Sequence, residues 1–358
     1  MDEPLQPSRK PLGFWKIVLA TFVGGLTASI VFSVLAFFFL LSLLIGSFLS
    51  QSAPKTIEEN SVLKINLSSI SELVTVDPWS TFLPSRGEGE QSISLTQALA
   101  AIRKAKANDR IRGIYLNLDS YSGGMASTAD LRRALLDFRS SGKFVVAYAD
   151  SYDQKAYYLS SVADQLILNP EGSVGLVGLA SSSLFYHQAL EKLGLKAQVF
   201  KVGTYKGAVE PFILDQLSEP NREQISVYLS GLWDFILREV SASRSIPVDS
   251  LRSFADQGLA FSEAETFVRR RLVDTLAYRL DVEGLIARRA GVSSPKDLHV
   301  VTLADLVNAP DPLDATRKSK EDVVTVVYAE GEIGDNPLSS EGITQELAQR
   351  LRELREEG

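Results

Sequence analysis

The stretch Arg112–Gly124, RGIYLNLDSYSGG, joins a short apolar segment to a turn that contains two adjacent glycines. Arg112–Leu118 has the length and apolar content of a strand, and Thr128–Ser140, after the turn, has the apolar spacing of a helix. Another apolar segment, Lys143–Ala149 (KFVVAYA), predicts a second strand. Two strands joined through a helix run parallel, so this stretch predicts an α/β fold.

The alternation of strands and helices continues on both sides of that stretch. Residues 77–91 interrupt it with a segment rich in Pro, Gly, Ser and charge, which indicates a loop or an inserted flap. We therefore expect one mainly parallel sheet with a helical extension. The remaining predicted elements are strands at Val62–Leu67 and Gln165–Leu168, helices at Leu95–Ala107, Gln154–Ser161 and Ser183–Leu193, an extended segment at Lys196–Val202, and only helices from Glu219 to Ala290, with breaks near Pro247 and Gly258.

The end of the chain copies the beginning of this body. A predicted strand at Val323–Tyr328 is followed by a polar turn and a predicted helix at Ile343–Leu354. Setting Leu95 on Ile343 aligns LTQALA with ITQELA, which indicates an internal duplication. The second copy would stop before the strand that Arg112–Leu118 supplies in the first. We expect it to be incomplete, either as a truncated gene product or as one piece of a longer protein.

The N-terminal region predicts a membrane anchor. No charged residue occurs from Ile17 to Pro54, and Ile17–Leu49 is almost wholly apolar, longer than a helix needs to span the ~30 Å hydrocarbon layer. A cleaved signal peptide is the alternative, but its apolar region covers only ~7–15 residues. Arg9, Lys10 and Lys16 precede the segment, which favours a cytoplasmic N-terminus with the remaining body outside.

Composition excludes several classes of function. The net charge is −7, from 37 Lys and Arg against 44 Asp and Glu, so no basic field is available for nucleic acid. Cysteine is absent, and the two histidines, His187 and His299, are too few for a three-histidine zinc site. Asp215, Glu219 and Glu223 would not share one helix face. We therefore expect no metal and no cofactor.

Two segments carry residues that suit catalysis. Gly123 and Gly124 lie between a predicted strand and a helix, where backbone N–H groups can point at an anion or a carbonyl oxygen; an ordinary turn is the alternative. Lys206 lies between Tyr205 and Gly207. A lysine in an apolar cleft has a lowered pKa and can act as a general base, whereas most lysines are solvated surface residues.

The segment Lys201–Phe212, KVGTYKGAVEPF, resembles the lysine segment of the signal peptide peptidase A and protease IV family, in its long two-repeat form. The resemblance extends over almost the whole chain and includes Asn169–Gly178 (NPEGSVGLVG) and the helical block around Trp233. It implies that each repeat has the ClpP/crotonase-like fold and that a Ser/Lys dyad is shared between the repeats. It also implies a ring-like homo-oligomer.

On this resemblance Lys206 is the catalytic lysine, and the nucleophile belongs to the second repeat. Met125 stands where the first copy would carry that serine, and a thioether cannot form an acyl intermediate. Ser122, Ser127 and Ser173 are alternative nucleophiles, although serine is an ordinary turn residue. We expect His187 and His299 to be structural.

The expected layout is a cytoplasmic N-terminus (1–16), a transmembrane anchor (17–49), a first peptidase repeat (50–318) and the start of a second (319–358). The expected function is that of a serine endopeptidase of the bacterial inner membrane, with its body in the periplasm, that degrades signal-peptide remnants or other apolar peptides. Lys206 would supply the general base. The alternatives are a catalytically silent, membrane-tethered peptide-binding or scaffold fragment and, more distantly, a crotonase-like acyl-CoA enzyme.

Overall fold

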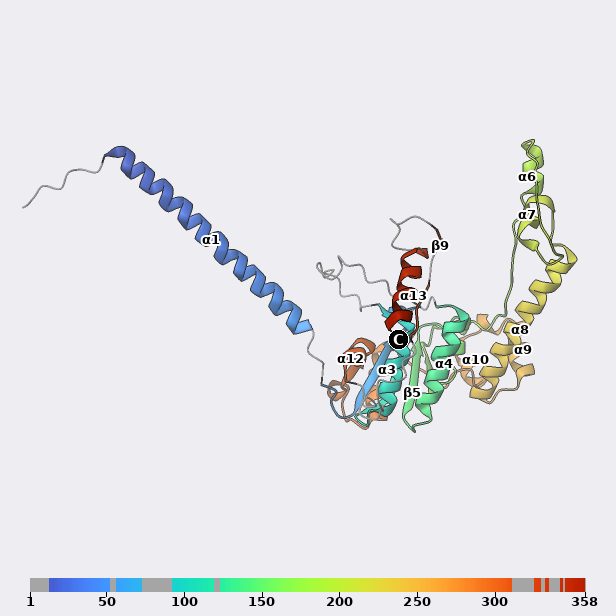
Figure 1. Ribbon diagram of the computed structural model, residues 1–358. Helices are drawn as coiled ribbons and strands as arrows, with labels where there is room; N and C mark the ends of the chain where they lie inside the picture. Colours follow the sequence, from blue (N-terminus) through green and yellow to red (C-terminus); the bar gives the residue numbers. More distant parts are fainter. Residues whose placement is uncertain are drawn as a thin grey trace, which may run out of the picture. The chain divides into compact units, whose positions relative to one another are not determined.

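The computed structural model describes residues 13–51, 56–72, 92–118, 123–310, 325–329, 332–334, 342–343 and 345–357. Contacts between Cα atoms divide the chain into two compact units, Met1–Asp311 and Pro312–Gly358. The first unit carries the sheet, the helices around it and the extension that contains Lys206 (Figure 1). The predicted boundary at residues 318 and 319 stays a prediction.

The first unit is built on a parallel sheet with strand order β7-β6-β5-β4-β1-β8. All neighbouring strands in it run parallel, which confirms the predicted α/β class. The four strands predicted between residues 62 and 168 occur within one residue of their expected bounds. The six strands are β1 (Ser61–Asn66), β4 (Ile111–Asn117), β5 (Phe144–Ala149), β6 (Gln165–Leu168), β7 (Thr275–Leu276) and β8 (Val300–Thr302).

Alternate residues of each strand enter two different apolar layers, as the two-residue period of a strand requires. On β5, Val145 and Ala147 join the larger layer, whereas Val146 and Tyr148 join the smaller one. The smaller layer is covered by helix α11 (Arg279–Ala290) through Val282, Ile286 and Ala290. Because both faces are covered, the central strands consist of nearly continuous apolar residues.

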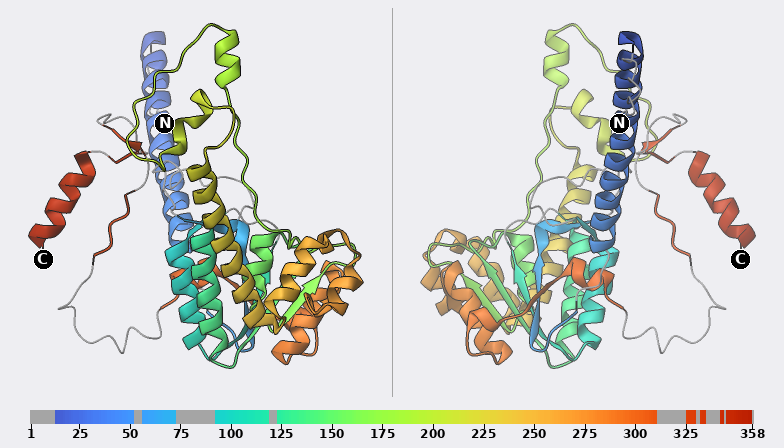
Figure 2. Two further views of the ribbon diagram at one scale, coloured as in Figure 1. Left: turned by 90° about the vertical axis from the view of Figure 1, so that its right-hand side faces the viewer. Right: turned by 90° about the vertical axis from the view of Figure 1, so that its left-hand side faces the viewer.

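Seven of the described helices pack on the larger layer. The helices α3 (Leu95–Ala107) and α4 (Met125–Arg139) lie side by side there (Figure 2). A capping box between Ser94 and Gln97 begins α3, and the Lys143 ammonium donates to three carbonyl oxygens at its end. The other helices in this layer are α5 (Gln154–Ser160), α8 (Glu219–Arg244), α9 (Val248–Asp256), α10 (Ala264–Arg269) and α12 (Leu303–Asn308).

Two expectations about secondary structure are wrong. The stretch from Glu219 to Ala290 is not entirely helical, because Thr275–Leu276 forms the edge strand β7 against β6. Residues 325–328, the described part of the strand predicted at Val323–Tyr328, have no regular structure. A strand is stable only with a hydrogen-bonded neighbour, and no described residue of the second unit pairs with 325–329.

The apolar N-terminal segment forms the helix α1 (Phe14–Gln51). Its portion Phe14–Ser42 has a mean hydropathy of 2.2 and none of it is buried against other residues. By length and composition this helix is able to cross a membrane. A signal sequence at the same place would have the same two properties.

The second unit repeats a local arrangement of the first. In the first unit β2 (Ile70–Ser71) pairs in parallel with β3 (Ile93–Ser94) just before α3. In the second, β9 (Glu332–Ile333) pairs in parallel with β10 (Gly342–Ile343) just before α13 (Gln345–Glu357).

These strand pairs correct the alignment of the two copies by one residue. Setting β10 on β3 places Leu347, Leu351 and Leu354 at the positions of the buried residues Ala98, Ile102 and Ala105. The alignment based on LTQALA and ITQELA would instead place the charged residues Glu346, Arg350 and Glu353 there. Buried helix positions favour apolar residues, so the sequence-based alignment is wrong by one residue.

A buried arginine joins the C-terminal half of α8 to the core. Arg132 on α4 is 1% exposed, and its guanidinium donates to the backbone oxygens of Tyr158 and Glu239 and to the hydroxyls of Ser161 and Ser243. It thereby links α4, the end of α5 and α8. A buried charge is tolerated only when its hydrogen bonds are satisfied in this way.

We expect Arg132→Met to lower the free energy of unfolding by about 2–4 kcal/mol, because it leaves buried acceptors without a donor. Denaturant unfolding followed by the fluorescence of Trp233 on α8 measures the change. The matched control is Arg133→Met, since Arg133 is exposed and its ion pair with Asp130 lies at the surface. Equal effects of the two substitutions would contradict the assigned role of Arg132.

A polar network lies at the carboxyl end of the central strands. Asp150, just after β5, accepts hydrogen bonds from the Tyr148 hydroxyl at 2.6 Å, the Arg279 guanidinium at 2.6 Å and the Asn169 amide at 3.0 Å. The bond from Tyr148, and then that from Arg279, lowers the pKa of Asp150 to about 2.

We expect this network to stabilise the fold only above acidic pH. A carboxylate whose pKa is lower in the folded protein contributes stability above its unfolded pKa of about 4, and that contribution is lost as the pH falls through about 2. The melting temperature of Asp150→Asn should therefore lie below that of the wild type at pH 6, and the two should converge between pH 4 and pH 2. A constant difference over that range would contradict the assignment.

Candidate active site

Lys206 belongs to residues 177–231, which form an arm. The arm extends away from the sheet, beyond the buried C-terminal half of α8 (Figures 1 and 2). The arm contains α6 (His187–Lys192), α7 (Glu210–Ile213) and the N-terminal half of α8. The predicted helix at Ser183–Leu193 is shorter than expected, and Lys196–Val202 forms no regular structure. Large apolar side chains are exposed along the arm, including Phe200 at 95% and Val202 at 92%.

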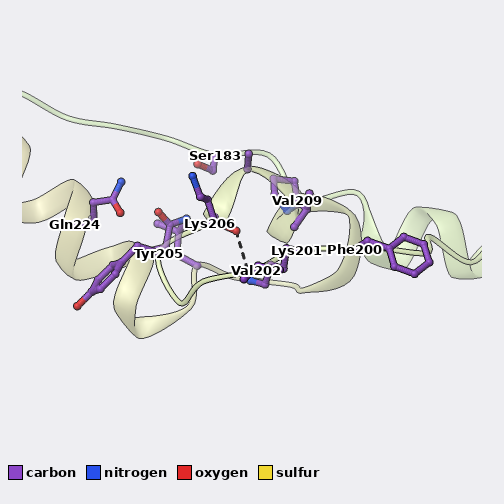
Figure 3. A pocket seen from close by; sticks show the side chains of 13 residues that line it. Ser183, Phe200, Lys201, Val202, Tyr205, Lys206, Val209 and Gln224 are labelled. Carbon is purple, nitrogen blue, oxygen red and sulfur yellow. Dashed lines mark hydrogen bonds between the residues drawn. The ribbon is translucent and has the colours of Figure 1, made fainter.

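An open pocket of about 680 Å³ lies on this arm, with Lys206 in its lining. Apolar walls come from Val202, Val209, Pro211 and Leu217, while Asn221 and Gln224 contribute amides from α8. In Figure 3 the Lys206 side chain points toward the part of the pocket where Ser183 lies. The lining thus combines apolar side chains with two lysines, Lys201 and Lys206.

The backbone around Lys206 is held by short-range contacts. Lys206 has φ −86° and ψ 73°, directly before the 3-10 turn Gly207–Val209 that leads into α7. Its carbonyl oxygen accepts a hydrogen bond from the Lys201 ammonium at 3.5 Å, the dashed line in Figure 3. The hydroxyl of the neighbouring Tyr205 donates to Glu223 on α8 at 3.4 Å. These contacts orient the lysine segment toward the start of α8.

The expected dry cleft around Lys206 does not exist among the described residues. Lys206 itself is exposed, as are Lys201 and Tyr205 beside it. A lysine acts as a general base when it is desolvated, so this pocket needs a further surface to cover it before Lys206 can take that role.

The Gly-Gly turn of the first copy is occupied by structural contacts. Gly124 is the N-cap of α4, and the backbone oxygen of Gly123 accepts a hydrogen bond from the Lys155 ammonium at 2.9 Å. Ser127 is buried and its hydroxyl donates to Glu72 at 2.5 Å. Met125, which the resemblance would align with a nucleophile, packs against the apolar core. The described residues of this turn therefore form the start of helix α4.

The two described serines that the sequence offered as nucleophiles lie outside the Lys206 pocket. Ser127 and Ser173 are not among the residues that line its pocket; Ser173 instead contacts Ser151. Ser122 lies outside the described residues. Ser183, which sequence reasoning missed, does line the pocket. It belongs to the run Ser181–Ser183 between β6 and α6, and nothing in that run signals a site, because only folding of the arm brings it near Lys206.

The two histidines have different surroundings. The His187 ring contacts the carboxylate of Asp215 at 3.2 Å, which ties α6 to the segment after α7. The His299 backbone oxygen accepts from the N–H of Val62 on β1. Among the described residues, no group of three or more His, Asp or Glu side chains is arranged to hold a metal ion.

We expect Gly207→Ala to damage the lysine segment. A Cβ atom at Gly207 would lie 2.2 Å from the amide nitrogen of Asn221, so one of the two segments would have to move. Unfolding free energy should fall by about 1–3 kcal/mol. The control is Gly231→Ala on α8, where a Cβ meets nothing within 4 Å and should add about 0.5–1 kcal/mol of helix stability. A neutral Gly207→Ala would contradict this close approach.

Solved structures with a similar chain trace include two proteases. A membrane-bound stomatin-specific protease in complex with a substrate peptide is 13% identical, with a TM-score of 0.37, and covers 72% of this chain and 96% of its own. The ClpP protease catalytic domain of Plasmodium falciparum is 8% identical, with a TM-score of 0.30, and covers 61% and 84%. These scores are low, and the fold class rests on the parallel sheet itself.

Sequence comparison gives closer relatives. Protease 4 of Salmonella typhi is 36% identical over 68% of this chain and 40% of its own length. Protease 4 of Haemophilus influenzae is 31% identical over 73% and 43%, and the chloroplastic serine protease SPPA of Arabidopsis thaliana is 30% identical over 74% and 39%. The chain thus spans about two-fifths of the length of these relatives. Residues 137–293, which include the arm and Lys206, match the model of peptidase family S49, and the chain therefore carries a domain of this family.

Proposed function

We propose that this chain supplies the general-base half of a membrane-anchored serine endopeptidase that degrades apolar peptides such as signal-peptide remnants. The observation that carries the proposal is the position of Lys206 in an apolar pocket inside the segment that matches peptidase family S49. Relatives named Protease 4 and signal peptide peptidase support the reaction class.

The chemistry needs a serine whose hydroxyl is activated. As the serine oxygen attacks the peptide carbonyl, the Lys206 amine takes its proton and then passes it to the departing amine, which leaves an acyl-enzyme. Water, activated by the same lysine, hydrolyses the ester and restores the serine. Backbone N–H groups of a Gly-Gly turn would stabilise the oxyanion.

The serine is proposed to come from a second repeat. The position equivalent to it in the first copy is Met125, which packs against the core. The exposed surroundings of Lys206 are consistent with this division, because a second repeat placed over the pocket would exclude water from the lysine. The exposed apolar residues of the arm would be buried by such a repeat. Contacts between copies in a homo-oligomer would also bury apolar surface of this kind.

Anchoring and location follow from α1 as part of the proposal. The helix is long and apolar enough to span a bilayer, and the basic residues lie before it. We place the body on the periplasmic side of the bacterial inner membrane, where apolar peptides released from the bilayer would reach the arm.

The second candidate is a catalytically silent, membrane-tethered peptide-binding fragment. The observation in its favour is that the described residues provide an apolar pocket but no serine shown in contact with Lys206. This candidate predicts binding of apolar peptide without cleavage, both by this chain alone and by a longer protein that includes the second repeat.

We expect Lys206→Ala to lower kcat for hydrolysis of an apolar peptide by about 1,000-fold or more in the protein extracted from its own membranes. Lys192→Ala, on α6 and outside the pocket, is the matched control and should keep nearly full activity. Ser183→Ala tests whether the serine in the pocket is the nucleophile; we expect that it is not and that activity is retained. Undiminished hydrolysis by Lys206→Ala would refute the proposed function.

A further inference from the structure

Glu210 is the most unusual residue of the arm. Between residues 177 and 235, all of which the structure describes, Glu210 alone is buried, with 0% of its surface exposed. It is covered by its immediate neighbours in a thin arm and not by an apolar core. Burying a carboxylate is costly, so a chain that does it here gains something specific from the arrangement.

The hydrogen bonds of the Glu210 carboxylate join it to the start of α8. One oxygen accepts from the Ser218 hydroxyl at 2.5 Å. The other accepts from the Ser218 backbone N–H at 3.0 Å and from the Asn221 amide at 3.1 Å. Ser218 is the N-cap of α8, and Glu210 begins α7. The carboxylate therefore fastens the helix that follows Lys206 to the helix that anchors the arm.

The same amide of Asn221 touches the residue next to the lysine. The nitrogen that donates to Glu210 lies only 2.2 Å from the place where Gly207 would carry a Cβ atom. Gly207 is consequently packed against an amide that cannot swing away without leaving Glu210. A chain of contacts runs from Glu210 through Asn221 to the backbone directly after Lys206.

We propose that Glu210 is a positioning residue for Lys206: through Ser218 and Asn221 it fixes the backbone from which the lysine side chain projects. This inference rests on the proposed role of Lys206 as the base. It also explains the spacing within KGAVEPF, because the glutamate must lie one turn after the lysine to begin α7 and face α8. An exposed lysine on a thin arm has no core to orient it, so a local polar clamp does this instead.

The direct test uses Glu210→Gln in the protein extracted from its own membranes. Glutamine keeps the shape of the side chain but turns an NH2 group toward donors that need an acceptor. Hydrogen exchange of the amides in residues 203–210 should become about 10-fold faster, while the amides of β4 and β5 should not change. In the same variant kcat should fall by about 10- to 100-fold with KM little changed, because misplacing a catalytic group costs rate more than binding.

Two other variants complete the test. Asn221→Ala removes the link to Gly207 and keeps the bonds from Ser218 to Glu210, so it should reproduce the loss of kcat even if Glu210→Gln fails to fold. Glu219→Gln is the matched control, because Glu219 is an exposed carboxylate on α8 that pairs with Arg222. This substitution should change neither the exchange nor kcat.

The outcomes separate this inference from the proposed function. Unchanged exchange at residues 203–210 in both Glu210→Gln and Asn221→Ala would overturn it, whatever the activity. Faster exchange with unchanged kcat, in an enzyme that Lys206→Ala inactivates, would overturn the positioning role and leave the base intact. Full activity of Lys206→Ala would refute the proposed function, and Glu210 would then have no catalytic group to position.

Discussion

The hydrogen bonds of the buried Arg132 guanidinium hold α8 to the sheet domain, and the position of the arm depends on them. Helix α8 has two parts with different surroundings: Ile236, Leu237 and Val240 are buried in the core, whereas the N-terminal half is largely exposed in the arm. Because a helix is stiff, fixing its C-terminal half fixes the direction in which its other half points. Lys206 therefore owes its location to contacts made at the far end of α8.

One positive and one negative side chain are buried among the contacts that position Lys206. Arg132 lies in the core, and its guanidinium donates to groups of α5 and α8. Glu210 lies in the arm, and its carboxylate accepts hydrogen bonds from the start of α8. Neither is an efficient source of stability, since removing a charge from water offsets much of the attraction it gains. What such groups provide is a defined geometry: an apolar contact tolerates sliding, whereas a carboxylate with three donors does not.

The arm combines a basic residue with exposed apolar surface, and these two properties have one physical explanation. Lysine is available as a general base at neutral pH when exclusion of water disfavours its charged form. Large exposed side chains such as Phe200 and Val202 favour a partner surface that excludes water. A pocket that is open in this chain alone is therefore compatible with catalysis once covered. The corrected alignment of the repeats places apolar residues of α13 at the positions through which α3 packs on the sheet.

The sequence by itself determined the α/β class and the bounds of α3 and most strands, whereas the role of Lys206 comes from the resemblance to a family and stays a prediction. The spacing of apolar residues, helix-capping residues and glycines affect only neighbouring residues, so a single sequence is enough to predict their effect. Only the tertiary structure decided that Thr275–Leu276 joins the sheet, that 325–329 does not form a strand, that Ser183 shares a pocket with Lys206 and that Glu210 is buried. These depend on which distant segments meet, and burial is a property of neighbours that no local pattern records.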